Sequence, residues 1–203
     1  KPPAPRFYMG RTRAGNLWRF RHDLPAATMD ALDRLCRAEP VTADLASPPR
    51  AYAAIRAILQ DHAPVAGEYR GPAYWIAEDS PPSPSAVLIS EENANLLQSS
   101  FPWARSLLQA QDAGPVAAAI EQGRAVAICF CSRLPNRAAE AGVETLPAHR
   151  GKGYATAAVA TWAAEVRRRG ILPLYSTSWE NLASQRIAHK LRMVLYGEDW
   201  SIR

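Results

Sequence analysis

A basic, glycine-containing turn at residues 149–155 (HRGKGYA) is the part of this sequence best suited to chemistry. Gly151 and Gly153 carry no Cβ, so the backbone can approach a ligand closely at these positions. The residues that follow have a helical pattern, and a helix N-terminus offers unpaired N–H groups and the positive end of the helix dipole. Arg150 and Lys152 add positive charge. The turn therefore predicts an anion site of the kind that holds phosphate groups.

Two common phosphate-binding motifs do not fit this turn. A Walker loop requires G-x-x-x-x-G-K-[ST], which the segment lacks. A dinucleotide fingerprint requires G-x-G-x-x-G, and Thr156 occupies the place of the third glycine. The next predicted strand ends in Tyr175, Ser176 and Thr177, without an acidic residue to hold a ribose. An ordinary turn that caps a surface helix is the remaining alternative.

The elements that must position this turn are predicted from hydrophobic periodicity. Apolar and alternating runs indicate strands at residues 124–133, 140–146, 172–177 and 193–202, the last of them a single strand or a bent pair. Helical patterns cover residues 115–122, 155–169 and 178–190. Ser178 is placed to cap the last helix, and Gly170 to end the one before it. This order predicts an α/β (α+β) sheet with helices packed on it.

The first half of the chain carries weaker patterns and matches no motif. A strand is expected at residues 16–21. Asp23 and Ser47 are predicted helix N-caps, because proline residues that suit a first helical turn follow each of them. Strands at residues 73–77 and 86–90 are expected to form a hairpin, since the turn-forming segment DSPPSPS separates them.

An internal boundary is predicted from the DAGP segment at residues 112–115. Before it, residues 95–111 indicate one broken helix or two short ones around Pro102. The boundary divides the chain into an N-terminal accessory region, residues 1–111, and a core, residues 112–203. The core alone supplies few strands, so the strands at 73–77 or 86–90 are expected to complete its sheet.

The composition narrows the classes of partner. The formal net charge is +5, but the basic residues are scattered and no basic run is interleaved with stacking aromatics, so nucleic acid ranks below an anionic cofactor. No apolar run approaches the roughly 20 residues of a membrane-spanning helix. Cys36, Cys129 and Cys131 fit a reducing cytoplasm better than a disulfide scaffold. They also lack the histidine partners of a zinc site, and no metal is expected.

The basic turn resembles motif A of the GNAT N-acetyltransferase superfamily, [Q/R]-x-x-G-x-[G/A], with Arg150, Gly153 and Ala155 at the defined positions. Asn181 and Ser184 are similar to a second signature, N-x-x-[A/S], on the helix after the next strand. The resemblance extends roughly from residue 115 to the C-terminus. It implies a mixed, mostly antiparallel GNAT-like sheet with splayed central parallel strands and flanking helices, plus the N-terminal accessory region.

The resemblance also implies a site for acetyl-CoA as co-substrate. The splayed strands would be residues 140–146 and 172–177, with the pantetheine arm between them. Backbone groups of Glu144, Thr145 and Leu146 would pair with the pantetheine amides. The pyrophosphate would be held by N–H groups of Arg150, Gly151, Lys152, Gly153, Tyr154 and Ala155. Asn181 and Ser184 would contact the far side of the cofactor.

The implied reaction is direct attack of a primary amine on the thioester in a ternary complex. Glu140 and Glu144 are the candidate general bases; they share one face of a regular strand, although a bulge would separate them, and solvated or ion-paired carboxylates are the alternative. Many family members place a tyrosine acid seven residues after the motif asparagine, where this chain has Ala188. Tyr196 is the candidate acid that replaces it, with Tyr175, His189 and solvent left open.

The resemblance leaves the acceptor open. It implies an amine on a small molecule or peptide, no nucleic acid and no membrane, and it is compatible with a homodimer. Tyr69, Trp75 and Trp103 could line an acceptor pocket, although core packing is the default for such side chains. A non-catalytic acyl-CoA-binding module or sensor is the alternative function, and a phosphate-binding or nucleic-acid-binding module is a further one.

Overall fold

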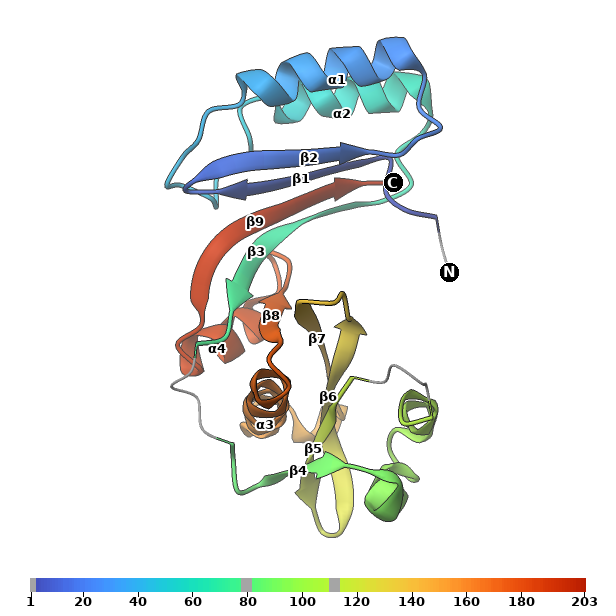
Figure 1. Ribbon diagram of the computed structural model, residues 1–203, viewed down its shortest axis with the longest axis vertical. Helices are drawn as coiled ribbons and strands as arrows, with labels where there is room; N and C mark the ends of the chain where they lie inside the picture. Colours follow the sequence, from blue (N-terminus) through green and yellow to red (C-terminus); the bar gives the residue numbers. More distant parts are fainter. Residues whose placement is uncertain (1–2, 78–81, 110–113) are drawn as a thin grey trace. The chain divides into compact units, whose positions relative to one another are not determined.

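The computed structural model describes residues 3–77, 82–109 and 114–203 (Figure 1). Within them the chain forms two compact units, each built from separate stretches of sequence. The first unit contains Lys1–Ala73, Ser176–Leu182 and Leu195–Arg203, and the second contains Tyr74–Tyr175 and Ala183–Val194. None of the helices among the described residues combines the length and hydrophobicity that crossing a bilayer requires.

The first unit is a sheet covered on one face by two helices (Figure 1). Its strands lie in the order β2-β1-β9-β3, with bounds β1 Phe7–Thr12, β2 Gly15–Phe20, β3 Glu68–Trp75 and β9 Val194–Ile202. β1 is antiparallel to both neighbours, and Phe7 pairs with Phe20 on one side and with Ile202 on the other. The helices are α1, Ala26–Ala38, and α2, Tyr52–His62. Their apolar faces close a core with Phe7, Met9 and Trp200 of the sheet.

The starts of both helices differ from the prediction. The N-cap residues are Pro25 and Ala51 rather than Asp23 and Ser47. The Asp23 carboxylate accepts a hydrogen bond from Arg21 Nε at 2.7 Å instead. α2 is capped from a distance, because the Glu39 carboxylate accepts hydrogen bonds from the N–H groups of residues 50 and 51, both at 2.8 Å. A carboxylate at a helix N-terminus satisfies orphan N–H groups whichever part of the chain supplies it.

The second unit contains a mixed sheet in the order β8-β7-β6-β5-β4. Its strands are β4 Ala86–Ile89, β5 Val116–Glu121, β6 Arg124–Arg133, β7 Ala138–Thr145 and β8 Leu172–Ser176. β4 to β7 are antiparallel to one another, and β7 and β8 are parallel. The helices are α3 Tyr154–Arg168 and α4 Leu182–Lys190, with 3-10 helices η1 Glu91–Leu97, η2 Pro102–Leu107 and η3 Pro147–His149.

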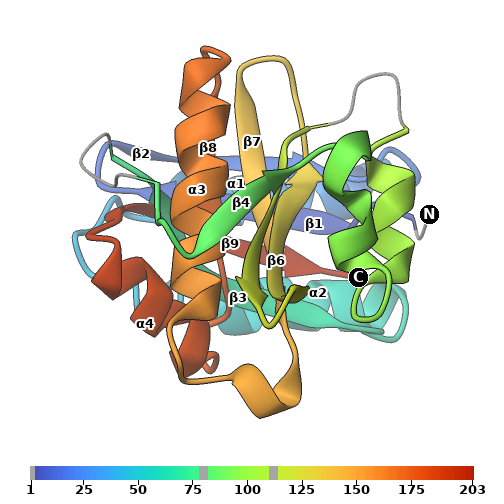
Figure 2. The same cartoon turned by 90° about the horizontal axis from the view of Figure 1, so that it is seen from below.

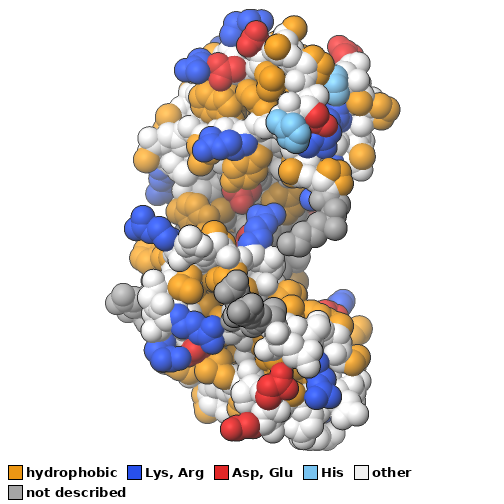
Figure 3. Space-filling view, turned by 45° about the vertical axis from the view of Figure 1, so that its right-hand side comes forward, with side chains coloured by type: hydrophobic (Ala, Val, Ile, Leu, Met, Phe, Trp, Pro, Cys, Tyr) orange, Lys and Arg blue, Asp and Glu red, His pale blue; other side chains and the backbone are white. Residues whose placement is uncertain are grey.

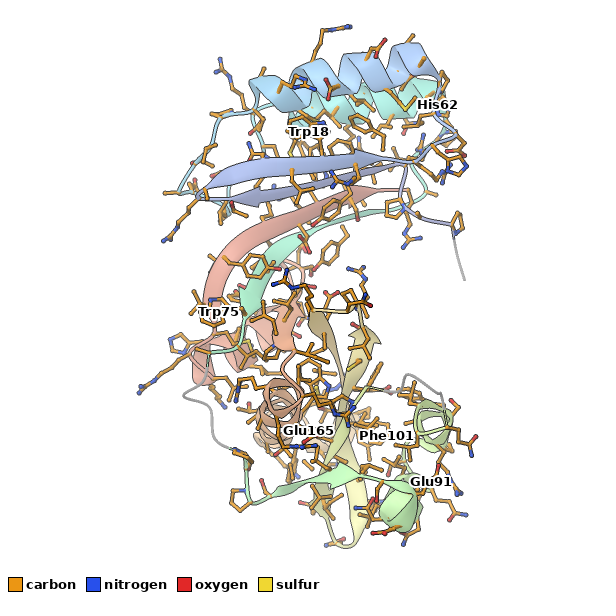
Figure 4. All side chains as sticks on the ribbon, viewed as in Figure 1. Trp18, His62, Trp75, Glu91, Phe101 and Glu165 are labelled. Carbon is orange, nitrogen blue, oxygen red and sulfur yellow. The ribbon has the colours of Figure 1, made fainter. Side chains whose placement is uncertain are left out.

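Opposite faces of this sheet are covered by different helices. α3 runs along one face of β5, β6 and β7, and the 3-10 helices η1 and η2 lie on the other side (Figures 1 and 2). Alternate strand residues follow this division: Ala117 and Cys129 pack with Trp162 of α3, whereas Val116 and Ile128 pack with Phe101. Phe101, which is fully buried between η1 and η2, is labelled in Figure 4.

The predicted mixed sheet with flanking helices is confirmed, but two local predictions are wrong. Residues 115–122 form strand β5 rather than a helix, because Val116 to Ala119 are buried between two covered faces, where burial overrides the helix preference of alanine. The strands at 73–77 and 86–90 do not form a hairpin: β4 pairs with β5. Part of the predicted loop between them, residues 79–81, lies outside the described residues.

The remaining predictions differ mainly in their bounds. Residues 95–111 contain the end of η1 and the whole of η2, which begins at Pro102, while residues 110–111 lie outside the described residues. α4 begins at Leu182 rather than directly after Ser178. The predicted boundary segment 112–115 includes residues 112–113, which are also outside the described residues. The division of the chain at residue 111 stays a prediction.

Candidate functional site

The parallel strands β7 and β8 are paired over only part of their length. Their register joins Ala138 to Leu172 and ends at the pair Glu140–Leu174. β7 continues to Thr145, and over this stretch it pairs with β6 as far as Ala127. The edge of β7 beyond Glu140 therefore presents backbone N–H and C=O groups that the β8 ladder does not use. Such an edge can pair with an extended ligand that carries amides.

The chain passes from β7 through η3 into the predicted anion turn. Gly151 and Gly153 adopt positive φ angles of +78° and +90°, a region that favours glycine. Gly153 is the N-cap of α3. Among the described residues, no heavy atom lies within 4 Å of the point where a Cβ would stand on either glycine. The turn is thus open on the side where an anion would meet the first N–H groups of α3.

The charge and shape of this turn fit a pyrophosphate. Arg150 and Lys152 are exposed and flank the glycines. The Arg150 side chain reaches back toward β7, where its Nε lies 3.4 Å from the Thr145 carbonyl oxygen. Lys and Arg side chains are otherwise scattered over the face shown in Figure 3. The residues present therefore suit a phosphorylated cofactor at the N-terminus of α3.

A carboxylate at the end of β5 holds both ends of the turn. Glu121 accepts a hydrogen bond from the Tyr154 hydroxyl, and its other oxygen lies 2.7 Å from His149 Nε2. The hydrogen bond from Tyr154, with a second contribution from His149, lowers the pKa of Glu121. The Glu121 carboxylate in turn raises the pKa of Tyr154. Glu121 could not be predicted from the sequence, since a lone carboxylate at a strand end belongs to no motif.

The two candidate bases lie on β7. The irregularity in this ladder is on β6, where residues 131 and 133 pair with the consecutive residues 141 and 140, so β7 itself stays regular. Glu140 and Glu144 therefore share one face of the strand. Glu140 forms an ion pair with the exposed Arg133 at 3.0 Å, whereas the Glu144 side chain is exposed.

The other candidates are distributed over both units. Ser184 lies in the second unit with Thr145, Leu146 and the anion turn, whereas Asn181 and Tyr196 lie in the first unit. Ala188, at the position of the usual tyrosine, is 1% exposed in the core. Tyr175 is also buried, and its hydroxyl lies 3.5 Å from the Ser184 carbonyl oxygen. The structure thus assembles the implied cofactor-binding residues of β7, the turn and Ser184 in one unit.

Comparison with known proteins identifies the family and the fold. A family model described as GNAT acetyltransferase matches residues 94–195, half of the chain. The fold is similar to that of a GCN5-related N-acetyltransferase-like protein from Streptococcus suis 89/1591, at 17% identity and a TM-score of 0.54 over 98% of this chain and 85% of that one. It is also similar to a GNAT-family acetyltransferase from Colwellia psychrerythraea, at 13% identity and a TM-score of 0.50 over 92% of this chain and 76% of that one.

A GNAT-family protein from Novosphingobium aromaticivorans DSM 12444 matches at 19% identity and a TM-score of 0.51 over 68% of this chain. This chain spans 65% of the length of that protein. No curated protein matches the sequence. The structural likenesses are below 20% identity and establish the fold. Together with the family model, they show that the chain belongs to the GNAT acetyltransferase family.

Proposed function

We propose that this protein is an N-acetyltransferase that moves an acetyl group from acetyl-CoA to a primary amine by direct attack in a ternary complex. The observation that carries the proposal is the separation of β7 from β8 after Glu140, followed by a glycine turn at the N-terminus of α3. A strand edge with unused amides, leading into an anion site, suits a ligand that is amide-rich at one end and phosphorylated at the other.

The proposed cofactor-binding roles are those that the family resemblance implies, and this geometry is compatible with them. Backbone groups of Thr145 and Leu146 would pair with the pantetheine arm of acetyl-CoA. The pyrophosphate would accept hydrogen bonds from the N–H groups of the turn and of the first residues of α3, from Arg150 to Ala155. Ser184, and Asn181 directly before α4, would contact the cofactor from the other side. These assignments rest on the family resemblance together with the open turn.

The transfer step requires two proton movements. The amine nitrogen forms a bond to the acetyl carbon, the carbon–sulfur bond breaks, and the thiolate leaves. A carboxylate that accepts the amine proton raises the rate, and Glu140 is the first candidate for this base, with Glu144 the second. Tyr196 is the candidate donor of a proton to the thiolate. Its hydroxyl can serve this purpose because a tyrosine is neutral at pH 7.

A second function, an acyl-CoA-binding module without catalysis, is favoured by one observation. Ala188 fills the position of the usual tyrosine acid, and its methyl side chain has no proton to give to a thiolate. Turnover distinguishes the two functions, because both require the cofactor site and only the enzyme releases CoA.

A cytoplasmic location forms part of the proposal. Cys36, Cys129 and Cys131 are free thiols in the structure. Such thiols are typical of a reducing compartment, where acetyl-CoA is also available as a co-substrate.

Titration with CoA thioesters tests the proposal. At a concentration of 100 times its dissociation constant, acetyl-CoA should add about 2.7 kcal/mol to the free energy of unfolding. For a chain of this length, that gain corresponds to a rise of about 5–10 °C in Tm. Release of CoA with a panel of amines, followed with a thiol reagent, then tests catalysis. A Tm unmoved by acetyl-CoA, propionyl-CoA and CoA would overturn the proposal, and a shift without turnover would favour the binding module.

A further inference from the structure

A second feature of the molecule, a pocket of about 520 Å³ in the first unit, has no role in the cofactor site. Its walls include Tyr52 of α2, Tyr69 and Arg70 of β3, and Trp179 and Glu180 from the segment after β8. Its volume lies within the roughly 300–1,000 Å³ of small-molecule sites. The segment that supplies Trp179 begins directly after β8, one of the two diverging strands. A ligand here would therefore contact the chain close in sequence to the proposed cofactor site.

The aromatic walls of this pocket are held in place by hydrogen bonds to buried or half-buried carboxylates. Trp179 Nε1 donates to Glu198 Oε1 at 2.9 Å. The Tyr52 ring stacks on the Trp200 ring, with centroids 5.1 Å apart. Glu68, which also lines the pocket, accepts a hydrogen bond from Trp200 and pairs with Arg56 at 3.2 Å. Glu68 is thus occupied by protein partners, and the rings form a fixed apolar surface.

Behind the wall, Arg70 of the lining shares one buried carboxylate with a second arginine. Glu198 is almost fully buried and its carboxylate serves two guanidinium groups: Arg11 Nη1 lies 2.6 Å from Oε2 and Arg70 Nε lies 2.5 Å from Oε1. The second contact is not aligned as a hydrogen bond, and the buried Nε atoms of Arg11 and Arg70 have no hydrogen-bond acceptor among the described residues. Asp44, the other nearby acid, is exposed. Arg70 Nη2 also donates a hydrogen bond to the Ala46 carbonyl oxygen. One carboxylate and one carbonyl leave further N–H groups of the Arg70 guanidinium for an anion, since each guanidinium has five donors.

The rim carries the opposite charge. Glu180 is exposed, and among the described residues its carboxylate has no hydrogen bond or ion pair. Its place next to Arg70 is fixed by the backbone, because the N–H of Trp179 donates to the Arg70 carbonyl at 3.3 Å. The pocket therefore offers a cation and an anion on two segments that one strand-to-loop hydrogen bond joins, and its lining also contains aromatic rings. That combination matches a small zwitterion better than a simple cation.

We propose that this pocket binds the acceptor and that the acceptor is an α-amino acid or a close analogue that carries both an amine and a carboxylate. Arg70 binds the carboxylate, Glu180 attracts the ammonium group before it loses its proton, and Tyr52, Tyr69 and Trp179 contact the side chain. The assignment of this ligand as the acceptor rests on the proposed acetyltransferase function, whereas the assignment of its chemical class rests on the pocket alone.

Acetyl transfer to the twenty common α-amino acids, compared with transfer to phenethylamine and tryptamine, tests the class of acceptor. The amines lack the carboxylate of phenylalanine and tryptophan and match them otherwise. We expect at least one amino acid to be acetylated with kcat/KM tenfold or more above either amine. Equal or faster turnover of the amines would overturn the proposal.

Variants then test the two charges. Arg70→Gln should raise KM for the amino acid at least tenfold and leave KM for the amines unchanged, and Arg70→Lys should restore part of the difference. Glu180→Gln should raise KM several-fold for both. Asp61→Asn removes an exposed carboxylate of α2 outside the pocket and should change neither. An Arg70→Gln enzyme that folds and keeps the wild-type preference would overturn the proposal.

Direct binding separates the pocket from the proposed function. Calorimetric titration of the wild-type protein with the same amino acids, without acetyl-CoA, should show binding that Arg70→Gln abolishes. Amino-acid binding without any response to acetyl-CoA would contradict the acetyltransferase function and uphold the pocket. A response to acetyl-CoA, with no amino acid bound or acetylated, would contradict the proposed pocket and uphold the acetyltransferase function.

Discussion

The carboxylate of Glu121 accepts a hydrogen bond from the hydroxyl of Tyr154 and so joins the end of β5 to the first residue of α3. The same carboxylate contacts His149, which lies on the other side of the glycine turn. Because both ends of the turn are fixed to one side chain, the N–H groups between them are held in place before any anion arrives. Such preorganisation lowers the entropy that binding must offset.

Glu121→Gln should therefore weaken the cofactor site without removing it. We expect KM for acetyl-CoA to rise several-fold with kcat little changed, because the amide keeps an acceptor for Tyr154 and loses the charge that faces His149. Steady-state kinetics with acetyl-CoA as the varied substrate measure this split. A fall in kcat at constant KM would contradict a positioning role.

The same pair predicts a pH dependence of stability. Tyr154 and His149 lower the pKa of Glu121 below its ordinary value of 4.5. The ionised carboxylate thus stabilises the folded state above pH 4.5, and this contribution is lost as the pH falls through the lower folded-state pKa. Tm measured from pH 7 to pH 3 should fall more steeply in the wild type than in Glu121→Gln. Parallel curves would contradict the pairing.

Gly153→Ala should impair both folding and cofactor binding. An L-residue at φ +90° costs roughly 1–2 kcal/mol, and the added methyl group would stand where the anion is expected. Gly123→Ala is the matched control, since Gly123 has φ +74° and equally open surroundings in the β5–β6 turn. Both variants should lose similar stability by urea denaturation. Only Gly153→Ala should lose the rise in Tm with acetyl-CoA, and an equal rise in both would remove the turn from the site.

Substitution of the two strand carboxylates should identify the base. We expect Glu140→Gln to lower kcat on the order of 10²-fold or more, and Glu144→Gln to leave it close to the wild-type value. Arg133→Gln is a useful companion, because it removes the ion-pair partner of Glu140 and leaves the carboxylate itself. A loss of activity confined to Glu144→Gln would transfer the role to that residue.

Glu165, which is labelled in Figure 4, predicts a second, larger pH effect; it lies near the end of α3, whereas the turn precedes the start of that helix. Arg168, with Arg169 second, lowers the pKa of this carboxyl to about 2, through contacts of 2.7 and 2.9 Å. Because both arginines are largely exposed, solvent screens the pairs, and we expect Glu165→Gln to cost about 1–2 kcal/mol at pH 7. The difference should vanish as the pH falls from about 4.5 to about 2. Urea denaturation at pH 7, 4 and 2.5 measures the difference in the free energy of unfolding between the wild type and Glu165→Gln. A difference that stays constant with pH would show that it has another cause.

The sequence predicted the elements with strong local patterns. β6, β7, β8 and α3 have clear periodicity, and the glycine turn has a composition that few other structures need, so the sequence could point to a candidate cofactor site there. β1 was not predicted because its Arg11 makes the sequence pattern look like that of an exposed polar segment. In the structure Arg11 pairs with the buried Glu198, and the strand lies inside the sheet. β5 was mistaken for a helix because alanine favours helices until tertiary burial decides otherwise.

A second candidate site, in the first unit, could not be predicted because it depends on contacts between distant segments. The pocket of the first unit combines α2, β3 and the segment after β8, and no one of these contains a motif. The cap of α2 also depends on a contact between separate segments. The Glu39 carboxylate that accepts from the start of α2 follows the end of α1. A single sequence shows that Glu39, Arg70 or Glu198 is charged, but not which partner each will meet.

The pairing of β1 with β9 has a consequence for how the molecule forms. Phe7 meets Ile202, so the first unit cannot complete its sheet until nearly all of this sequence is available. Closing so long a loop costs conformational entropy before the pairing of β1 with β9 can stabilise the sheet. This cost slows folding. Most of the second unit lies within one continuous stretch, Tyr74–Tyr175, so most of it can form before the residues of β9 are available. During synthesis the strands near the start of this sequence would therefore remain unpaired with β9 while the half that carries the glycine turn is already taking shape.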